Sequence, residues 1–215
     1  MDTRNNQLTL ETRARYDRNA PFYDLLTRGS ERMLEPGRAE LWRRVRGPRV
    51  LEVGVGTGRG MAYYRPELAV TAIDFSPRML AQARQRTARE QITVDLREAD
   101  VQALPFPDAS FDTVIATCVF CSVPDPILGL RELRRVLVLG GQLLLLEHVL
   151  SHRPLLSRAM RLLNPLVVRL SGANINRETV ENVRRAGFAR LHVEDRWLDV
   201  VKQIEAAAPS PVSTD

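Results

Sequence analysis

The feature that most constrains the fold is a glycine cluster between a short apolar segment and a helical pattern. Residues 50–53 have the apolar character of a buried strand, and Gly54-Val55-Gly56-Thr57-Gly58 follows directly. Glycines allow a tight turn and close approach to a ligand because they carry no Cβ. A strand that ends in such a loop and passes toward a helix is a β-α unit, which favours an α/β fold with a ligand at the strand end.

The same unit repeats along the chain. Residues 70–74 form a second strand pattern, and Ser76-Pro77 is typical of an N-cap followed by proline, which predicts a helix to about Glu90. Further strands are expected over 92–96, 111–117, 142–149, 189–193 and 200–206, and helices over 124–137 and 176–186, the last ended by Gly187. The continuous apolar run over 143–146 indicates a parallel sheet covered on both faces.

These patterns predict an α/β fold with a seven-stranded, mostly parallel, Rossmann-like sheet, an antiparallel last strand, helices on both faces and an N-terminal helical cap. With 215 residues, the chain is long enough for one such domain and too short for two large ones. We expect residues 1–45 to form the cap, 46–206 the core and 207–215 a flexible tail.

Charge and cysteine content limit the partners. The net charge is +5 and comes almost entirely from arginine, since Lys202 is the only lysine. Arginines scattered along a chain are typical of a solvated surface, although a pI near 9.8 permits an anionic partner. Cys118 and Cys121 can build neither a disulfide framework nor a four-ligand metal site, so we expect no metal and a reducing interior.

Neither a leader nor a membrane span is expected. The first thirty residues lack an apolar leader segment, and no run approaches the roughly 18 apolar residues of a spanning helix. The expected localisation is cytoplasmic, with peripheral attachment to the inner face of the membrane as the alternative.

The glycine spacing discriminates between nucleotide cofactors. A dinucleotide-binding motif that starts at Gly54 requires glycine or alanine at the position of Arg59. A motif that starts at Gly56 requires the same at the position of Met61, so neither register fits. Gly-x-Gly-x-Gly preceded by Glu52 instead resembles the loop of class I S-adenosylmethionine-dependent methyltransferases. The resemblance covers about residues 45–206. It includes an acid twenty residues after Gly54, an acid after the third strand, and the runs Ala-Leu-Pro-Phe-Pro-Asp (103–108) and Ser-Phe-Asp (110–112) before the fourth strand.

The resemblance implies S-adenosylmethionine as cofactor and S-adenosylhomocysteine as product. It places Glu52 near the amino-acid end, Asp74 on the ribose hydroxyls, and Asp100 with the backbone N–H of Val101 at the adenine edge. Phe75 and Met79 are expected against adenine, with ordinary core packing as the alternative. The remaining expected cofactor contacts are Gly54, Gly56, Gly58 and Thr117.

The acceptor is expected to be read by the segment after the fourth strand, Thr-Cys-Val-Phe-Cys-Ser-Val-Pro (117–124). It lacks the Asn-Pro-Pro-Tyr type of motif with which other members hold a flipped base or an amide nitrogen, so no nucleic-acid partner is expected. Cys118 and Cys121 are either pocket-lining residues or small buried hydrophobes.

The segment resembles the branch that contains quinone C-methyltransferases, small-thiol S-methyltransferases and soluble bacterial phosphatidylethanolamine N-methyltransferases. The acceptor is therefore a small or lipid-like molecule. A phosphatidylethanolamine-type amine is the leading hypothesis, and a thiol or a quinone ring is the alternative. A hypothesis of another class is a non-catalytic subunit that binds S-adenosylmethionine for regulation.

Three residues are candidates for the catalytic step. His148 ends the fifth strand pattern and could deprotonate an acceptor, or be a histidine satisfied by a neighbouring loop. Tyr16 and Tyr23 lie on the cap, which in the resembled families folds over the sulfonium, and they either orient the acceptor or pack the cap.

Residues 151–170 form an amphipathic segment. Leu156, Met160, Leu163 and Val167 follow helical spacing beside Arg158, Arg161 and Arg169, and Pro165 is expected to kink or divide the helix. The segment could face an anionic membrane surface as a lid, the core of its own chain or a second subunit. The oligomeric state is left open.

Overall fold

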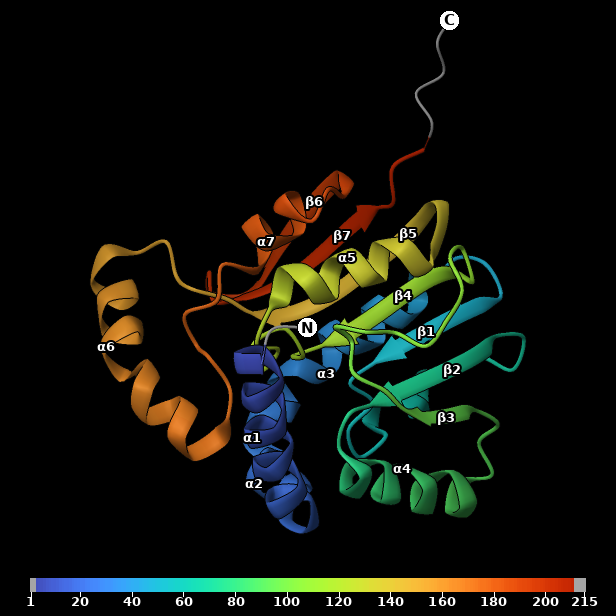
Figure 1. The fold of residues 1–215 in the computed structure, drawn as a ribbon, viewed down its shortest axis with the longest axis horizontal. Helices are drawn as coiled ribbons and strands as arrows, with labels where there is room; N and C mark the ends of the chain where they lie inside the picture. Colours follow the sequence, from blue (N-terminus) through green and yellow to red (C-terminus); the bar gives the residue numbers. More distant parts are fainter. Residues whose placement is uncertain (1–2, 211–215) are drawn as a thin grey trace, which may run out of the picture.

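A computed structural model describes residues 3–210, in which seven strands form one sheet. The strand order is β3-β2-β1-β4-β5-β7-β6, as Figure 1 shows. The strands are β1 (Arg49–Val53), β2 (Ala69–Asp74), β3 (Asp95–Glu98), β4 (Phe111–Thr117), β5 (Leu137–His148), β6 (Ala189–Trp197) and β7 (Val201–Ala207).

All neighbouring strands are parallel except those that pair with β7. Strands β1, β2, β3, β4 and β5 run in one direction, while β7 is antiparallel to both β5 and β6. Only three residues separate β6 from β7, and so short a connection can join only antiparallel neighbours. The predicted mostly parallel seven-stranded sheet with an antiparallel last strand is confirmed.

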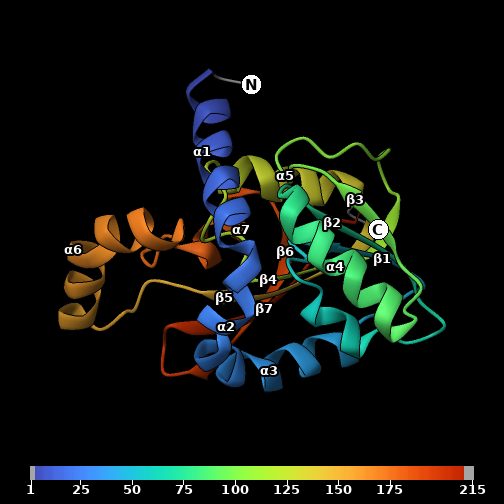
Figure 2. The ribbon, with the colours of Figure 1, turned by 90° about the horizontal axis from the view of Figure 1, so that it is seen from below.

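Helices cover both faces of the sheet. One face packs against α5 (Pro126–Val136) and α7 (Thr179–Arg185), and the other against α3 (Arg28–Arg43) and α4 (Pro77–Glu90). Figure 2 shows α5 and α3 on opposite sides of the strands. Consecutive residues of β5 alternate between the two cores, with Leu143 and Leu145 on the α5 side and Leu144 and Leu146 on the α3 side. This two-sided burial explains the continuous apolar run.

Several helix ends follow the sequence signals. Ser76 caps α4 by accepting a hydrogen bond from the Met79 backbone N–H, and Pro77 is its first residue. Helix α5 begins at Pro126 rather than at Pro124 because Asp125 is its cap and accepts from the N–H groups of Ile127 and Leu128. Gly187 follows α7 with a φ of +85°, as expected of a helix stop.

The predicted cap is helical. It consists of α1 (Thr3–Asn19), the 3₁₀ turn η1 (Ala20–Phe22), α2 (Tyr23–Leu26) and α3. The last element to be placed, α6 (Pro154–Ser171), is one continuous helix with Pro165 inside it, so the proline does not divide it. In Figures 1 and 2, α6 projects away from the sheet.

Other boundaries also differ from the sequence-based expectation. The glycine loop leads into a short 3₁₀ helix, η2 (Arg59–Tyr63), because the chain becomes extended at Tyr64 just before Arg65-Pro66. Strand β3 begins three residues later than predicted, after Gln91 has ended α4 in a left-handed conformation. Strand β5 begins at Leu137, five residues before the predicted start at residue 142, and continues through Gly140 and Gly141. Within the predicted tail, β7 extends to Ala207, and residues 211–215 lie outside the described residues.

Candidate active site

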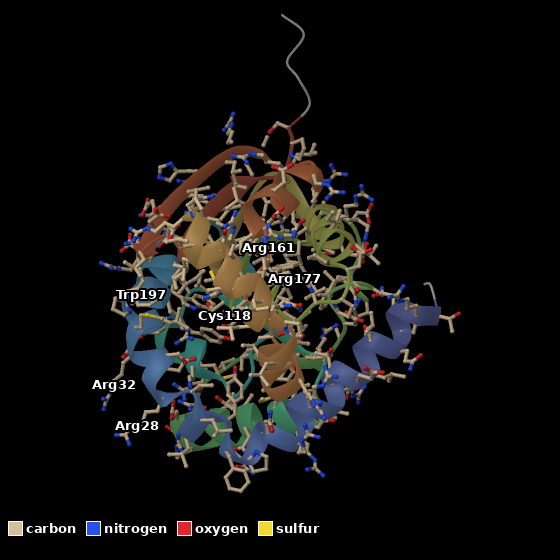
Figure 3. All side chains as sticks on the ribbon, turned by 90° about the vertical axis from the view of Figure 1, so that its left-hand side faces the viewer. Arg28, Arg32, Cys118, Arg161, Arg177 and Trp197 are labelled. Carbon is tan, nitrogen blue, oxygen red and sulfur yellow. The ribbon has the colours of Figure 1, made fainter. Side chains whose placement is uncertain are left out.

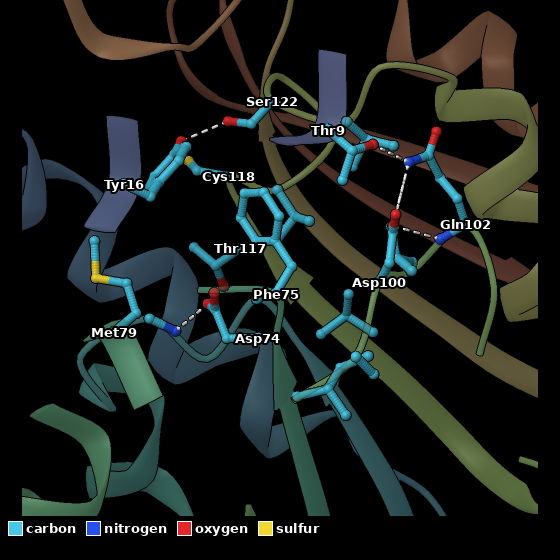
Figure 4. Close-up of a pocket in the computed structure, with 18 of the residues that line it drawn as sticks. Thr9, Tyr16, Asp74, Phe75, Met79, Asp100, Gln102, Thr117, Cys118 and Ser122 are labelled. Carbon is cyan, nitrogen blue, oxygen red and sulfur yellow. Dashed lines mark hydrogen bonds between the residues drawn. The ribbon is translucent and has the colours of Figure 1, made fainter. Parts of the chain in front are cut away.

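A pocket lies at the carboxyl ends of the parallel strands, where the strand order reverses between β1 and β4. Ligands of open α/β sheets bind at this point because the loops on its two sides diverge. Figure 4 shows the pocket. It is lined by ends of the strands, the loops that follow them and the N-terminal cap: Thr9, Tyr16, Tyr23, Val53, Gly54, Gly56, Ile73, Asp74, Phe75, Met79, Ala99, Asp100, Val101, Gln102, Thr117, Cys118, Val119, Ser122, Val123 and Pro124.

The glycine loop and Asp74 form one side of the pocket. Asp74 is buried, and its carboxylate accepts hydrogen bonds of 2.9 Å from the backbone N–H groups of Gly56 and Ser76. Burial raises its pKa to about 6, although these N–H groups favour the charged form. Gly54 has a φ of +68°, and a Cβ there would lie 2.4 Å from Val119, so glycine is required both for the turn and for the close packing.

Asp100 forms the next part of the pocket and is held by Gln102. The backbone N–H of Gln102 donates to Asp100 Oδ1 over 2.9 Å, and its side-chain amide donates to both carboxylate oxygens. The same amide nitrogen is 3.1 Å from Thr9 Oγ1, while Gln102 Oε1 accepts from Asn5 of the cap. Gln102 therefore connects α1 to the loop after β3.

Three aromatic rings lie together above the glycine loop. The Tyr16 ring is 5.7 Å from that of Phe75 and 6.3 Å from that of Tyr23. The Tyr16 hydroxyl is hydrogen-bonded to Ser122 on the loop after β4, as Figure 4 shows. Burial raises the pKa of each tyrosine hydroxyl above the ordinary value of a tyrosine. Both side chains are therefore neutral phenols at physiological pH.

The cap is also fixed to the glycine loop by Asp24 of α2. Its carboxylate accepts a hydrogen bond of 2.7 Å from Thr57 Oγ1 and forms ion pairs with Arg59 and Arg86 at 3.0 and 3.3 Å. These contacts lower the pKa of Asp24, outweighing the opposing effect of desolvation. The cap therefore covers the pocket through charged contacts as well as aromatic ones.

The loop after β4 is held by a buried glutamate from the neighbouring strand. Glu147 Oε1 accepts hydrogen bonds from the backbone N–H groups of Val119 and Phe120, and Cys118 adopts a φ of +53° where the loop leaves β4. Burial raises the pKa of Glu147 to about 7 and that of the Cys121 thiol to about 12; the pKa of Cys118 is raised as well. Both thiols are therefore uncharged near neutral pH, and of the two Cys118 lines the pocket.

Most of the predicted site residues meet in this pocket, but three lie outside its lining. Glu52 is buried behind the loop, where its carboxylate accepts from the Tyr64 hydroxyl, and burial raises its pKa to about 7. Gly58 has a φ of +86° and packs against Met61. His148 is partly buried, and burial lowers its pKa.

Several residues that line the pocket or attach the cap to the glycine loop carried no sequence signal. Thr9 and Asp24 belong to a helical cap whose placement over the sheet is a long-range feature. Ser122 and Gln102 follow strand ends, but their bonds to Tyr16 and to Thr9 depend on the same placement. Residues 3–210 contain no cluster of three or more metal-ligating side chains, and no helix in that range is sufficiently long and apolar to cross a bilayer.

Comparison with known proteins agrees with this geometry. A family model described as a methyltransferase domain matches residues 51–145. The chain is 32% identical to demethylmenaquinone methyltransferase of Clavibacter sepedonicus, over 92% of this chain and 90% of that protein. The chain belongs to the class I S-adenosylmethionine-dependent methyltransferases. The cofactor of this family is S-adenosylmethionine.

Two further relatives are named for other activities. This methyltransferase is 44% identical to phosphatidylethanolamine N-methyltransferase of Cereibacter sphaeroides over 48% of its own chain and 52% of the relative. It is 31% identical to the human thiol S-methyltransferase TMT1B over 86% of its chain and 82% of that protein. The chain thus spans only about half the length of the first of these relatives.

A solved structure confirms the fold. A possible histamine N-methyltransferase from Thermotoga maritima superposes with a TM-score of 0.70, covering 91% of this methyltransferase and 99% of the other chain at 21% identity. The Rossmann-like class predicted from the sequence is therefore confirmed.

Proposed function

We propose that this methyltransferase transfers a methyl group from S-adenosylmethionine to the amine of a phosphatidylethanolamine-type lipid at an anionic membrane surface. Residues 1–45 act as the cap of a single methyltransferase domain in this proposal. The protein is cytoplasmic and attaches peripherally to the inner face of the membrane.

The cofactor contacts follow from the donors and acceptors of the pocket. Asp74 accepts the two ribose hydroxyls, and Asp100 with the N–H of Val101 reads the adenine edge, with Phe75 and Met79 against the ring. Gly54 and Gly56 bring backbone close to the amino-acid part, and Thr117 closes the pocket below it. The supporting observation is that Asp74 is buried and that, among the described residues, its hydrogen bonds come from N–H groups, so its second acceptor positions suit hydroxyl donors.

Two residues proposed from the sequence act from outside the pocket lining in this scheme. Burial raises the pKa of Glu52, behind the glycine loop, to about 7, and the ammonium of the amino-acid part would favour its charged form. Gly58 supplies the left-handed turn that ends the loop. Bound S-adenosylmethionine supplies an electrophilic methyl group.

The observation that carries an amine acceptor is the cluster of Tyr16, Tyr23 and Phe75. Neutral aromatic rings attract cations through their electron-rich faces, and methylation of an amine builds positive charge on its nitrogen. The nitrogen lone pair attacks the methyl carbon while the carbon–sulfur bond breaks, and an ammonium entering the site first loses a proton. In this scheme Tyr16 and Tyr23 orient the amine, and the proton passes through water to His148, which lies outside the pocket lining.

The lipid part of the proposal rests on the surface of α6. Leu155 and Leu162 are 82% and 81% exposed, and Leu163 and Leu166 are more than half exposed. Exposed arginines lie along the same helix, namely Arg158, Arg161 and Arg169. In Figure 3, α6 crosses the face bordered by Arg28, Arg32 and Trp197, with Cys118 of the pocket behind it. Exposed leucines among arginines fit an anionic bilayer better than open solvent.

A quinone ring is the second candidate acceptor. It is favoured by the match to a demethylmenaquinone methyltransferase over 90% of that relative's length. A quinone with an isoprenoid tail would use the same apolar surface, whereas a small thiol would not need it.

An acceptor panel tests the proposal. Purified protein is given S-adenosylmethionine with phosphatidylethanolamine in anionic vesicles, a demethylated quinol, an aliphatic thiol or a phenol, and release of S-adenosylhomocysteine is measured. We expect release with phosphatidylethanolamine and none with Asp74→Asn, the matched control for cofactor dependence. Release with the quinol or the thiol alone contradicts the proposal that the acceptor is an amine. If no member of the panel is methylated, the result favours the hypothesis of a non-catalytic subunit.

A further inference from the structure

A second cavity, of about 440 Å³, lies behind the loop after β4 and shares no lining residue with the cofactor pocket. Its walls are the segment after β5, the start of α7, and one residue each from β6 and β7. Arg177, Arg184 and Lys202 line it, together with His152 and Thr179. The function proposed above makes no use of this cavity.

Two residues of the cavity wall each have a buried polar atom that has no partner among the residues that the structure describes. Thr179 is fully buried, and its Oγ1 makes no hydrogen bond. The Nε of Arg177 is likewise buried without an acceptor, although its Nη2 donates to the Val123 carbonyl over 2.7 Å. Buried polar groups are almost always paired, so two orphan donors beside one cavity indicate a missing acceptor.

The charge around the cavity favours an anion. Burial lowers the pKa of Arg177, since no carboxylate contacts its guanidinium closely enough to compensate the desolvation. Lys202 is almost completely buried and is paired with Asp195. The two lining glutamates, Glu178 and Glu181, have more than half of their side chains exposed and are paired with Arg161 and Arg184. Ser151 is also buried in the wall, and its hydroxyl and the His152 N–H donate to the Asp199 carboxylate. Among the lining residues themselves, the buried polar groups are donors, and the carboxylates stand at the rim.

We propose that this cavity binds a phosphate group, either as free phosphate or on a phosphate ester such as a lipid headgroup. Thr179 Oγ1 and Arg177 Nε donate to the phosphate oxygens, and Arg184 and Lys202 supply further positive charge. The volume leaves room for an ester substituent beside the phosphate. Ser151 and His152, on the cavity wall, immediately precede α6, so a lipid phosphate bound here would lie next to the helix with the exposed leucines.

The test measures binding of inorganic phosphate and of a soluble short-chain phosphatidic acid by calorimetry, with S-adenosylhomocysteine binding measured on the same samples. Thr179→Val removes an unpartnered hydroxyl and keeps the shape of the side chain. It should leave the melting temperature unchanged or raised, yet weaken phosphate binding about tenfold. Arg184→Gln should weaken phosphate binding as well. Arg185→Gln is the matched control, because Arg185 is an exposed arginine of the same helix outside the cavity lining.

Binding of phosphatidic acid alone, lost in Thr179→Val, supports the site and identifies the lipid headgroup as its source. Binding of inorganic phosphate with the same loss supports the site for the free anion. The proposal is overturned if neither compound binds, if both variants bind like the parent, or if phosphate competes with S-adenosylhomocysteine. Because S-adenosylhomocysteine binding is measured separately, a failure of the methyl-acceptor proposal does not affect the result.

Discussion

Asp74 must satisfy two opposing conditions at the level of a single side chain. Its burial raises its pKa to about 6, which favours the protonated acid. Ribose hydroxyls, however, need a charged acceptor to be bound most strongly. The ligand-free protein and the cofactor complex thus favour opposite charge states of one carboxyl group, and cofactor binding becomes linked to proton release.

Affinity for S-adenosylhomocysteine should therefore rise as the pH is raised through about 6 and level off above it. Below this pKa the affinity should fall by up to about tenfold per pH unit, because a proton must leave before the ribose binds. Asp74→Asn should remove this pH dependence.

Asp74→Ala should cost about 2–4 kcal/mol of the free energy of cofactor binding without unfolding the protein. Calorimetry across the pH range checks both; an Asp74→Ala affinity within about threefold of the parent contradicts the ribose role.

Tyr23→Phe and His148→Ala separate the two catalytic roles. Tyr23 lines the pocket, so Tyr23→Phe should lower kcat several-fold with little change in the affinity for the cofactor. His148→Ala should change the pH profile of kcat near neutral pH if the imidazole accepts the acceptor proton. The measurement is steady-state kinetics over pH with the acceptor found in the panel. An unchanged rate and profile in both variants assigns these residues to packing.

Among single residues, the sequence predicted the positions of those that lie at the ends of strands. Glycines and acids at the ends of successive strands meet wherever parallel strands form one sheet, so Gly54, Asp74 and Asp100 could be placed together without coordinates. Asp24 and Thr9 could not, because they reach the pocket only through the packing of the cap. His148 was expected at the cofactor side, yet the pocket is lined by Thr117 and Cys118 of the neighbouring strand instead.

Among the elements, α6 has the most unusual surface. Leu156 and Met160 pack against the core, whereas the stripe expected from the sequence also included Leu163, which is 51% exposed. The apolar residues of this helix therefore extend around more than the side that faces the protein. Part of the segment packs on its own chain and part remains uncovered in the single chain.

Anionic vesicles should bind the protein through the uncovered side of α6. Each arginine near an anionic surface contributes about 1 kcal/mol, and this attraction should weaken as the Debye length falls from about 10 Å at 0.1 M salt toward 3 Å at 1 M. Leu155→Ser with Leu162→Ser should reduce the binding that survives high salt. Replacing Arg158, Arg161 and Arg169 should remove mainly the salt-sensitive part. Flotation with the vesicles measures both effects.

Leu139→Ser is the control for this experiment. Leu139 is 69% exposed but lies on β5 near its start, at the other end of the strand from the pocket. It should bind vesicles like the parent. A parent protein that does not float with anionic vesicles at low salt contradicts the membrane surface and favours a soluble acceptor.

Element types were easier to predict than element ends. Every strand and the cap helices were expected from periodicity, but β5 continues through Gly140 and Gly141, whose backbone groups are hydrogen-bonded to those of Ala208. The helix expected after the glycine loop is only a 3₁₀ turn, since Pro66 limits the space available to it. Local sequence signals predict these element ends poorly, because the ends depend on contacts with segments that are distant in the sequence.

For the molecule as a whole, three buried carboxyl groups make stability depend on pH. Burial raises the pKa of Asp74 to about 6 and those of Glu52 and Glu147 to about 7. An acid whose pKa is higher in the folded chain than in the unfolded chain stabilises the fold most at low pH. That contribution is lost as the pH rises from the unfolded value toward the folded one. These groups therefore oppose folding at neutral pH and above.

Glu147→Gln should make the free energy of unfolding less dependent on pH between about 4.5 and about 7. The amide oxygen can still accept from Val119 and Phe120, so the loop after β4 should keep its support. Above pH 7 the variant should be at least as stable as the parent. Denaturant titrations at a series of pH values measure the difference, and an identical pH slope in both proteins would contradict the burial of a titrating carboxyl here.

The attachment of the cap through Asp24 also has a kinetic consequence. A cofactor enclosed beneath α1 and α2 leaves only when the contacts of Asp24 with Thr57, Arg59 and Arg86 open. Contacts between charged groups that are partly exposed weaken as salt is added, whereas apolar contacts do not. The residence time of S-adenosylhomocysteine on the enzyme should therefore shorten with ionic strength, and product release rather than methyl transfer would set the turnover rate at low salt.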